Sequence, residues 1–331
     1  MSFLDRNLKI TPIDVWIDPT GPRERAIITH GHGDHARRGH GAVLATPDTI
    51  AIMKTRYGED CAGSFQPLEF GVPLMIGEVE VTLFPAGHIL GSAQVRLRYR
   101  GETIVDTGDY KRLPDPTAQA FELVPCDILV TEATFGLPVF QHPKPADEIA
   151  RLLKSVADNS ERSHLIGAYA LGKAQRVMSL LRAGGYDRPI YLHGAMVELT
   201  QLYEARGISL GPTKLALEAT KAELAGQIVI APPGALKDRW SRRLSDPILA
   251  MASGWMSVKQ RARQSGVELP LVISDHADWN ELRETIAETG AQQIWVTHGR
   301  EDALVYWCRQ QGLSAEPLNI VGYDEAGEGG E

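Results

Sequence analysis

The chain has 331 residues, of which 43% are hydrophobic and 23% are charged, and this composition excludes a disordered or a collagen-like protein. A chain of this length forms one large domain or two ordinary ones, with enough core to fold without disulfide or zinc staples. Its 42 acidic residues outnumber the 34 basic ones, for a net charge of −8. The chain therefore lacks the overall basic charge of a nucleic-acid binder, so a polyanion would need a local basic patch or bound metal.

The cysteines and the N-terminus indicate a cytoplasmic protein. Cys61, Cys126 and Cys308 are far apart and form no CxxC pair, which is typical of reduced thiols. The opening segment MSFLDRNLKITP carries charges and lacks the apolar stretch of a signal peptide. No apolar run approaches the ~20 residues that a membrane-spanning helix needs, so we expect no membrane partner.

Short strands dominate the first third of the chain, and a polar residue follows most of them closely. Alternating or continuous apolar patterns predict strands at residues 26–29, 80–84, 95–99, 103–105 and 127–131. The residues that follow four of these strands are His30, His88, Asp109 and Glu132. Loops at strand ends are where layered α/β proteins build their sites, so we expect these side chains to share one site.

From about residue 141 helices alternate with strands, a pattern typical of parallel βα units. We predict helices at 146–158, 172–183, 197–206 and 213–224, and strands at 163–169, 189–192, 227–231 and 247–251. Strands then return at 269–274 and 293–297, before His276 and His298. We therefore predict that 1–136 and 271–331 form one domain and that 137–270 is inserted into it. The acidic, glycine-rich end from about residue 325 is predicted to be disordered.

Four candidate metal ligands, His30, His32, Asp34 and His35, lie within six residues in the sequence THGHGDH. Imidazole and carboxylate groups suit zinc-like ions, and the two glycines let alternate side chains converge. A solvated histidine-rich loop is the alternative interpretation, but such a loop would not directly follow an apolar strand. The first two histidines can meet one ion, and Asp34 with His35 a second. Further ligands would come from later strand ends, namely His88, Asp109 and His298.

The order HxHxDH, GHxxGS and TGD resembles the metallo-β-lactamase fold. The segments TEATFG, AYALGKAQ, SDHAD and THGRE narrow this resemblance to the β-CASP nucleases, which cut DNA or RNA phosphodiesters. The segments GHGDHARRGH, PAGHILGSAQV, GDYKR and EATFGLPVF are most similar to bacterial exonucleases associated with DNA ligases, often named messenger-RNA 3′-end processing factors. The resemblance covers nearly the whole chain. It implies an α/β fold, a metallo-β-lactamase αββα sandwich with an inserted α/β β-CASP domain.

The resemblance also implies a two-zinc site, with manganese as the alternative metal. It implies that His30, His32 and His88 hold the first ion, that Asp34, His35 and His298 hold the second, and that Asp109 bridges both. The catalytic residues that it implies are His276 as general acid, Glu132 as the carboxylate that holds the His276 ring, and Asp34. A plain surface carboxylate is the alternative interpretation of Glu132.

Four basic residues are the best candidates for contacts with a substrate backbone. Lys111 and Arg112 directly follow the GDY segment, and Lys173 and Arg176 begin a helix whose N-terminus can also bind phosphate. The run KDRWSRR at 237–243 is another basic cluster, for which a solvated surface is the more common interpretation.

These features together predict a two-metal phosphodiesterase, an exonuclease that degrades DNA in DNA repair, with single-stranded DNA as the expected substrate. Its predicted partners are nucleic acid and, functionally, a DNA ligase and a helicase. The alternative is an RNA 3′-end processing nuclease, because a histidine at His298 resembles the RNA-cleaving branch of the family. A small-molecule metallo-hydrolase is a weaker alternative, and the full set of ligands argues against a non-catalytic scaffold.

Overall fold

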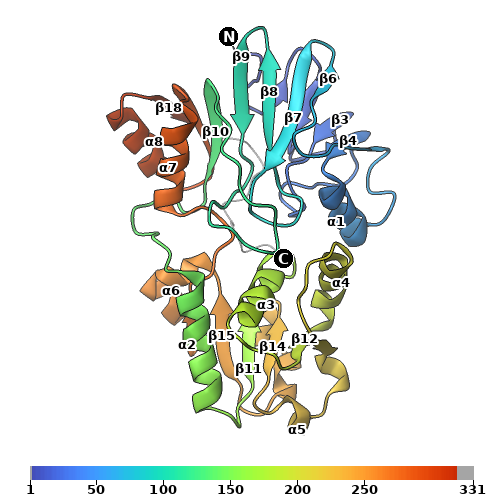
Figure 1. Cartoon of the computed structure of the whole chain (residues 1–331), viewed down its shortest axis with the longest axis vertical. Helices are drawn as coiled ribbons and strands as arrows, with labels where there is room; N and C mark the ends of the chain where they lie inside the picture. The colour runs from blue at the N-terminus through green and yellow to red at the C-terminus, as the bar shows by residue number, and fades with distance from the viewer. Residues whose placement is uncertain (1, 319–331) are drawn as a thin grey trace. The chain divides into compact units, whose positions relative to one another are not determined.

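The structure is a computed structural model, and it describes residues 2–318. The predicted disordered end from about residue 325 lies outside the described residues. The chain divides into two units, drawn in Figure 1. Of the described residues, 2–140 and 276–318 belong to unit 1, and Gln141–Asp275 form unit 2.

Unit 1 contains two sheets. The first has the order β1-β2-β3-β4-β5, and its strands are β1 (Lys9–Ile10), β2 (Val15–Ile17), β3 (Arg25–Ile27), β4 (Ala42–Ala45) and β5 (Phe65–Pro67). The second has the order β18-β17-β10-β9-β8-β7-β6. Its strands are β6 (Leu74–Ile76), β7 (Val79–Pro85), β8 (Ala93–Tyr99), β9 (Glu102–Asp106), β10 (Ile128–Ala133), β17 (Gln293–Gly299) and β18 (Ser314–Pro317). Strands β9, β10, β17 and β18 are parallel. The candidate site residues at or after the carboxyl ends of β9, β10 and β17 therefore lie at the same edge of the sheet.

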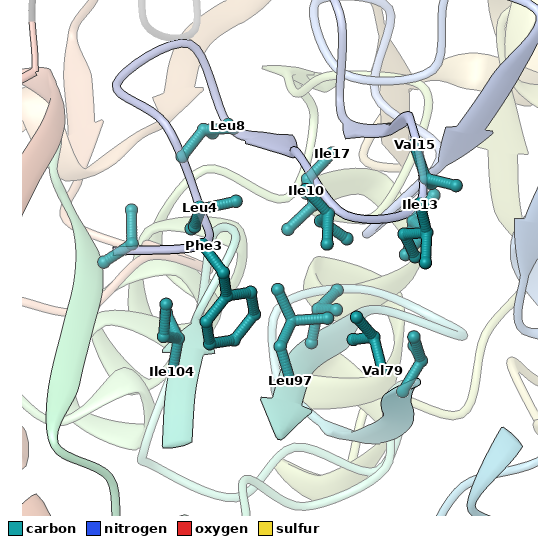
Figure 2. Close-up of a cluster of buried hydrophobic side chains, with 14 of the residues drawn as sticks. Phe3, Leu4, Leu8, Ile10, Ile13, Val15, Ile17, Val79, Leu97 and Ile104 are labelled. Carbon is teal, nitrogen blue, oxygen red and sulfur yellow. The ribbon is translucent and has the colours of Figure 1, made fainter. Parts of the chain in front are cut away.

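The main core of unit 1 lies between these two sheets. Figure 2 shows Ile10 and Ile17 of the first sheet opposite Leu97 and Val79 of the second. The alternation along β8 explains this packing, because successive side chains of a strand point to opposite faces. Burying such aliphatic side chains contributes roughly 1.5–3 kcal/mol each, so this layer holds the two sheets together.

Three helices cover the outer faces of the two sheets. Helix α1 (Pro47–Tyr57) packs Met53 into a cluster with Ile28 and Val43, beside the first sheet. Helices α7 (Trp279–Thr289) and α8 (Glu301–Gln310) pack against the second sheet, and they lie beside β18 in Figure 1. Unit 1 is therefore layered as helix, sheet, sheet and helices.

Unit 2 is built on one parallel sheet of order β13-β12-β14-β11-β15-β16. Its strands are β11 (His164–Gly167), β12 (Ile190–Leu192), β13 (Thr213–Leu215), β14 (Ile228–Ala231), β15 (Ile248–Ala252) and β16 (Leu269–Leu271). Its helices are α2 (Pro145–Asp158), α3 (Lys173–Ala183), α4 (Val197–Ala205), α5 (Lys221–Leu224) and α6 (Lys259–Ser265). Short 3₁₀ turns η1 to η5 lie at Gly194–Met196, Ala216–Glu218, Pro233–Leu236, Arg239–Arg243 and Gly254–Ser257.

The helix predicted at 213–224 is wrong. Its first residues form β13, which pairs with β12, and only Lys221–Leu224 is helical. Helix α5 begins late because Thr220 caps it, its Oγ1 accepting from the N–H of Glu223. A β-branched threonine after Pro212 suits an edge strand, and the pairing with β12 outweighs the helix propensity of this segment.

Neither a membrane-spanning helix nor a disulfide is found in the described part of the chain. No helix within residues 2–318 is long and apolar enough to cross a bilayer. The three cysteines are free and buried.

Candidate metal centre

The loop after β3 carries four of the predicted ligands, and Asp18 holds its two ends. Asp18 accepts a hydrogen bond from the N–H of Thr29 at 2.8 Å, and its Oδ2 lies 2.8 Å from Nδ1 of His35. The Nδ1 side of the His35 ring is thereby fixed, which leaves Nε2 for the centre. Sequence reasoning missed Asp18, although it follows the apolar strand Val15–Ile17 just as the other site residues follow theirs.

Glycine is required at Gly31 by a close approach of α1. A Cβ at Gly31 would lie 2.4 Å from Cγ2 of Ile52, so any side chain would push the loop off the helix. Arg56, also on α1, donates to the carbonyl of Gly31 at 2.7 Å. Packing and this hydrogen bond together fix the loop between His30 and His32.

His88 and Asp109 come from the loops after β7 and β9, which pack directly on each other. A Cβ at Gly87 would lie 2.2 Å from the carbonyl oxygen of Lys111, and Gly87 has φ +75°. A Cβ at Gly108 would lie 2.9 Å from the side chain of Thr29. The loop after β9 therefore packs closely against the loop that contains His30. The loop after β9 therefore places Asp109 beside His30, with 3.4 Å between Oδ2 and Nε2.

His298 occupies a bulge in β17. The register between β10 and β17 shifts there, because Glu132 pairs with Thr297 whereas Ala133 pairs with Gly299, so that the ladder skips position 298. Its φ is +57°, a conformation that costs a non-glycine residue about 1–3 kcal/mol and clusters at functional sites. Bulges typically redirect a side chain, and this one brings His298 to the ring of His35, 4.8 Å away between centroids.

The Gly299→Ala variant is expected to lower the melting temperature and to disturb His298. Gly299 has φ +107°, and a Cβ there would lie 2.4 Å from the carbonyl oxygen of Ala133. Gly312→Ala is the matched control, because Gly312 also has a positive φ, +81°, but nothing lies within 4 Å of its added Cβ. Thermal unfolding of both variants should show the larger loss for Gly299→Ala. Equal losses of melting temperature would mean that the positive φ alone destabilises the variants, and that the close approach to the carbonyl of Ala133 does not contribute.

The structure brings most of the predicted ligands together in two overlapping groups. In the first group the ligand atoms of His30, His32, His88 and Asp109 all lie within 4.8 Å of one another. In the second group those of His35, Asp109 and His298 do so, and Asp109 belongs to both groups. Asp34 belongs to neither; its carboxylate is half exposed, with Oδ2 3.8 Å from Nε2 of His35.

The electrostatics of His30, His298 and Asp109 favour cation binding at neutral pH. Burial, and then the neighbouring His35, lower the pKa of His30 well below the ordinary histidine value and that of His298 to about 4. Both imidazoles are therefore neutral at pH 7, with a free electron pair for a cation. Burial alone would raise the pKa of Asp109, but the charges of His35 and His276 outweigh it and lower that pKa, so Asp109 is ionised.

The donor set fits a divalent metal ion. Nε2 of His30 and Oδ1 of Asp109 are buried and have no hydrogen-bond partner among the described residues. Buried polar atoms in folded proteins are nearly always satisfied, so two atoms of one group without a hydrogen-bond partner are suited to hold a cation. Three imidazoles and one carboxylate in the first group match the ligand types and the coordination number that zinc prefers.

His276 pairs with Glu132 beside these groups. Nδ1 of His276 lies 3.1 Å from Oε2 of Glu132, and Glu132 also accepts from the N–H of Tyr110 at 2.8 Å. The carbonyl of Tyr110 in turn accepts from the N–H of Ala277 at 2.6 Å, so the loop after β9 fixes both members of the pair. Burial raises the pKa of Glu132, and the charge of His276 opposes that rise.

Lys111 and Arg112, which the sequence predicts as substrate contacts, form ion pairs with glutamates of α7. Nζ of Lys111 lies 2.5 Å from Glu281 of α7, and its side chain is 5% exposed. Arg112 pairs with Glu288 of the same helix at 2.7 Å. The two side chains fasten the loop after Asp109 to α7, and their contact with a substrate stays a prediction.

Lys173 and Arg176 are also held inside their own unit. Nζ of Lys173 lies 2.7 Å from Oδ1 of Asp275, and Arg176 donates to the carbonyl of Ser274 at 3.2 Å. Both side chains are buried. They contact the chain segment just before His276, and their contact with a substrate stays a prediction.

Comparison with known proteins gives relatives but no family model, since none matches the chain. A probable DNA ligase of Opitutus terrae is 30% identical over 307 residues, which cover 91% of this chain and 29% of that protein. A ribonuclease of Thermus thermophilus is 25% identical over 91% of this chain and 87% of its own length. An uncharacterized protein encoded in the lig 3′ region of Acidianus ambivalens is 29% identical over 41% of this chain and 94% of its own length.

A solved structure shares the fold. The crystal structure of a protein of unknown function from Enterococcus faecalis matches 82% of this chain and 74% of its own with a TM-score of 0.53 and 16% identity. The relatives of this chain thus include proteins named as nucleases and one named as a DNA ligase, which is consistent with the resemblance to the metallo-β-lactamase/β-CASP nucleases. The chain is similar to two proteins whose names refer to a DNA ligase or to the lig region, and it spans less than a third of the Opitutus protein.

Proposed function

We propose that the chain is a metal-dependent phosphodiesterase, an exonuclease that degrades single-stranded DNA in DNA repair. The observation that carries this proposal is the pair of ligand groups sharing Asp109, with the His276–Glu132 pair directly beside them. In this proposal unit 1 is a metallo-β-lactamase αββα sandwich, and unit 2 is the inserted β-CASP domain.

The ligand assignment is part of the proposal. His30, His32 and His88 would hold one ion, His35, Asp34 and His298 the other, and Asp109 both. Zinc is the proposed metal and manganese the alternative. Two such ions, when bound, supply positive charge for the phosphoryl oxygens and lower the pKa of water toward neutrality.

The chain's own contribution to the reaction is the proton for the leaving sugar oxygen. Glu132 holds Nδ1 of His276, so Nε2 is the nitrogen that can exchange a proton. The carboxylate also stabilises the charged imidazolium, which lets His276 give its proton to the leaving oxygen as a general acid. Tyr110 and Ala277 keep the ring in place through the backbone hydrogen bonds described above.

The choice of DNA rests on a relative that matches 91% of this chain. That relative is named a probable DNA ligase, and the Acidianus protein is encoded beside lig. A functional link to a DNA ligase is therefore part of the proposal. RNA 3′-end processing is the second candidate, because the Thermus relative is named a ribonuclease and a further relative, from Aspergillus fumigatus, is named an endoribonuclease. A small-molecule hydrolase is disfavoured, because it would need neither the His276–Glu132 pair nor a whole α/β unit.

The test is a time course with single-stranded DNA and RNA of the same sequence, labelled at either the 5′ or the 3′ end. We expect linear DNA to be shortened from one end, faster than RNA, and the reaction to stop with a chelator and resume when zinc or manganese is added. Circular single-stranded DNA is the control for end dependence. Faster RNA cleavage would establish the second candidate, and equal cleavage of circular DNA would contradict an exonuclease.

A further inference from the structure

Unit 2 carries an exposed basic surface at the carboxyl edge of its parallel sheet. Two connections supply it: the one after β14, which contains η4, and the one after β15, which contains η5 and α6. Residues 237–266 contain seven basic and two acidic residues, in a chain whose net charge is −8. Six of the basic side chains are exposed and form the surface that we name the basic edge: Lys237, Arg239, Arg242, Lys259, Arg261 and Arg263.

The two connections meet in space. Nζ of Lys237 lies 3.7 Å from the position of a Cβ at Gly266, the residue at which α6 ends. Strands β14 and β15 flank β11 on its two sides, so their connections leave the same edge of the sheet. In open parallel sheets ligands bind outside the carboxyl ends of the strands, where the connections diverge.

The positive charge of this surface is not neutralised by a carboxylate of residues 2–318. None of the six side chains forms an ion pair with a carboxylate in residues 2–318. The nearby acid Asp246 is itself paired with Arg162, 3.0 Å away. The basic edge is therefore available to a polyanion, unlike Lys111 and Arg112, whose charges α7 takes up.

Two tryptophans accompany these charges. The guanidinium of Arg261 lies 3.8 Å from the ring centroid of Trp255, and the half-buried Trp240 contacts His193, which follows β12, with centroids 4.6 Å apart. Aromatic rings and stacked guanidinium planes are the surfaces on which unpaired bases stack, and basic side chains follow the phosphates. An acidic protein partner would use the charges but not these flat groups.

We propose that the basic edge is a binding site for single-stranded nucleic acid, separate from the residues that carry out the reaction. The inference rests on the proposed function for its ligand class.

The test measures binding by the full chain, by fluorescence anisotropy of a labelled 30-nucleotide single-stranded DNA, with a chelator present to prevent turnover. The double variant Arg239→Ala/Arg242→Ala is compared with Arg188→Ala/Lys221→Ala, which removes the same charge from exposed residues that precede the amino ends of β12 and β14. Each lost phosphate contact lowers the salt slope of log K by about 0.7. We therefore expect a slope smaller by about 1.4 and roughly tenfold weaker binding at physiological salt for the first variant only.

Competitor polyanions and a small substrate distinguish failure of this inference from failure of the proposed function. Polyglutamate and inorganic polyphosphate carry charge without bases, so they should displace the oligonucleotide less well than unlabelled DNA does. Unchanged binding by the Arg239/Arg242 variant, or equal competition by polyglutamate, would overturn this inference. Both variants should still cleave bis(p-nitrophenyl) phosphate at the wild-type rate. A wild-type chain that binds DNA through these residues but cleaves no phosphodiester would contradict the proposed function and leave this inference standing.

Discussion

The His276→Ala variant is expected to lose nuclease turnover by roughly 10²–10⁴-fold, the usual effect of removing a general acid, while keeping its metal. The loss should be much smaller on a nitrophenyl phosphodiester, because nitrophenolate leaves without a proton. The two rates, measured with the metal content of the same preparation, test the assignment. Metal retention matters because the ring nitrogen of His276 also lies within 4.8 Å of ligand atoms of Asp109 and Glu132.

A matched control for His276→Ala is His164→Ala. His164 is also buried, and it lies in unit 2 with Nε2 2.9 Å from Oγ of Ser155. Its replacement removes a buried imidazole without touching either ligand group, so turnover should survive any loss of stability. Equal rate losses by His276→Ala on both substrates, or loss of an ion, would contradict a role as general acid and would instead make His276 a ligand.

The Asp109→Asn variant is expected to lose metal, because Asp109 is the residue that the two ligand groups share. An amide oxygen is neutral and binds a divalent cation more weakly than a carboxylate does. Elemental analysis should show less than two ions per chain. Added zinc should also raise the melting temperature less than in the wild type, since stabilisation by a ligand follows its affinity for the folded state.

Asp106→Asn is the control for this change. Asp106 lies on the same strand, β9, and its Oδ1 accepts from the N–H of Gly108 at 2.9 Å, a bond that asparagine can also make. Burial raises the pKa of Asp106 to about 7, so its carboxyl is already partly protonated at neutral pH. We expect this variant to keep both ions. Full metal occupancy in Asp109→Asn would rule out the bridging role.

The sequence by itself determined the strands that carry the site and the identity of the residues that follow them. Predicted strands at 80–84, 103–105 and 127–131 fall within β7 and β9 and overlap β10, because alternation and apolar runs are local properties of the chain. The spacing of His30, His32 and His35 after an apolar strand is equally local. Ligand chemistry could be inferred there because imidazoles so close together have few other uses.

Only the tertiary structure decided which charges are available and which residues hold the ligands in place. Lys111 and Lys173 look like free cations in the sequence, but their partners Glu281 and Asp275 lie more than a hundred residues away along the chain. Asp18 contacts His35, and the bulge at His298 depends on the register between β10 and β17. The helix predicted at 213–224 failed for the same reason, since pairing with β12 made its first residues a strand. Each of these outcomes depends on contacts between distant segments, which local patterns of hydrophobicity do not encode.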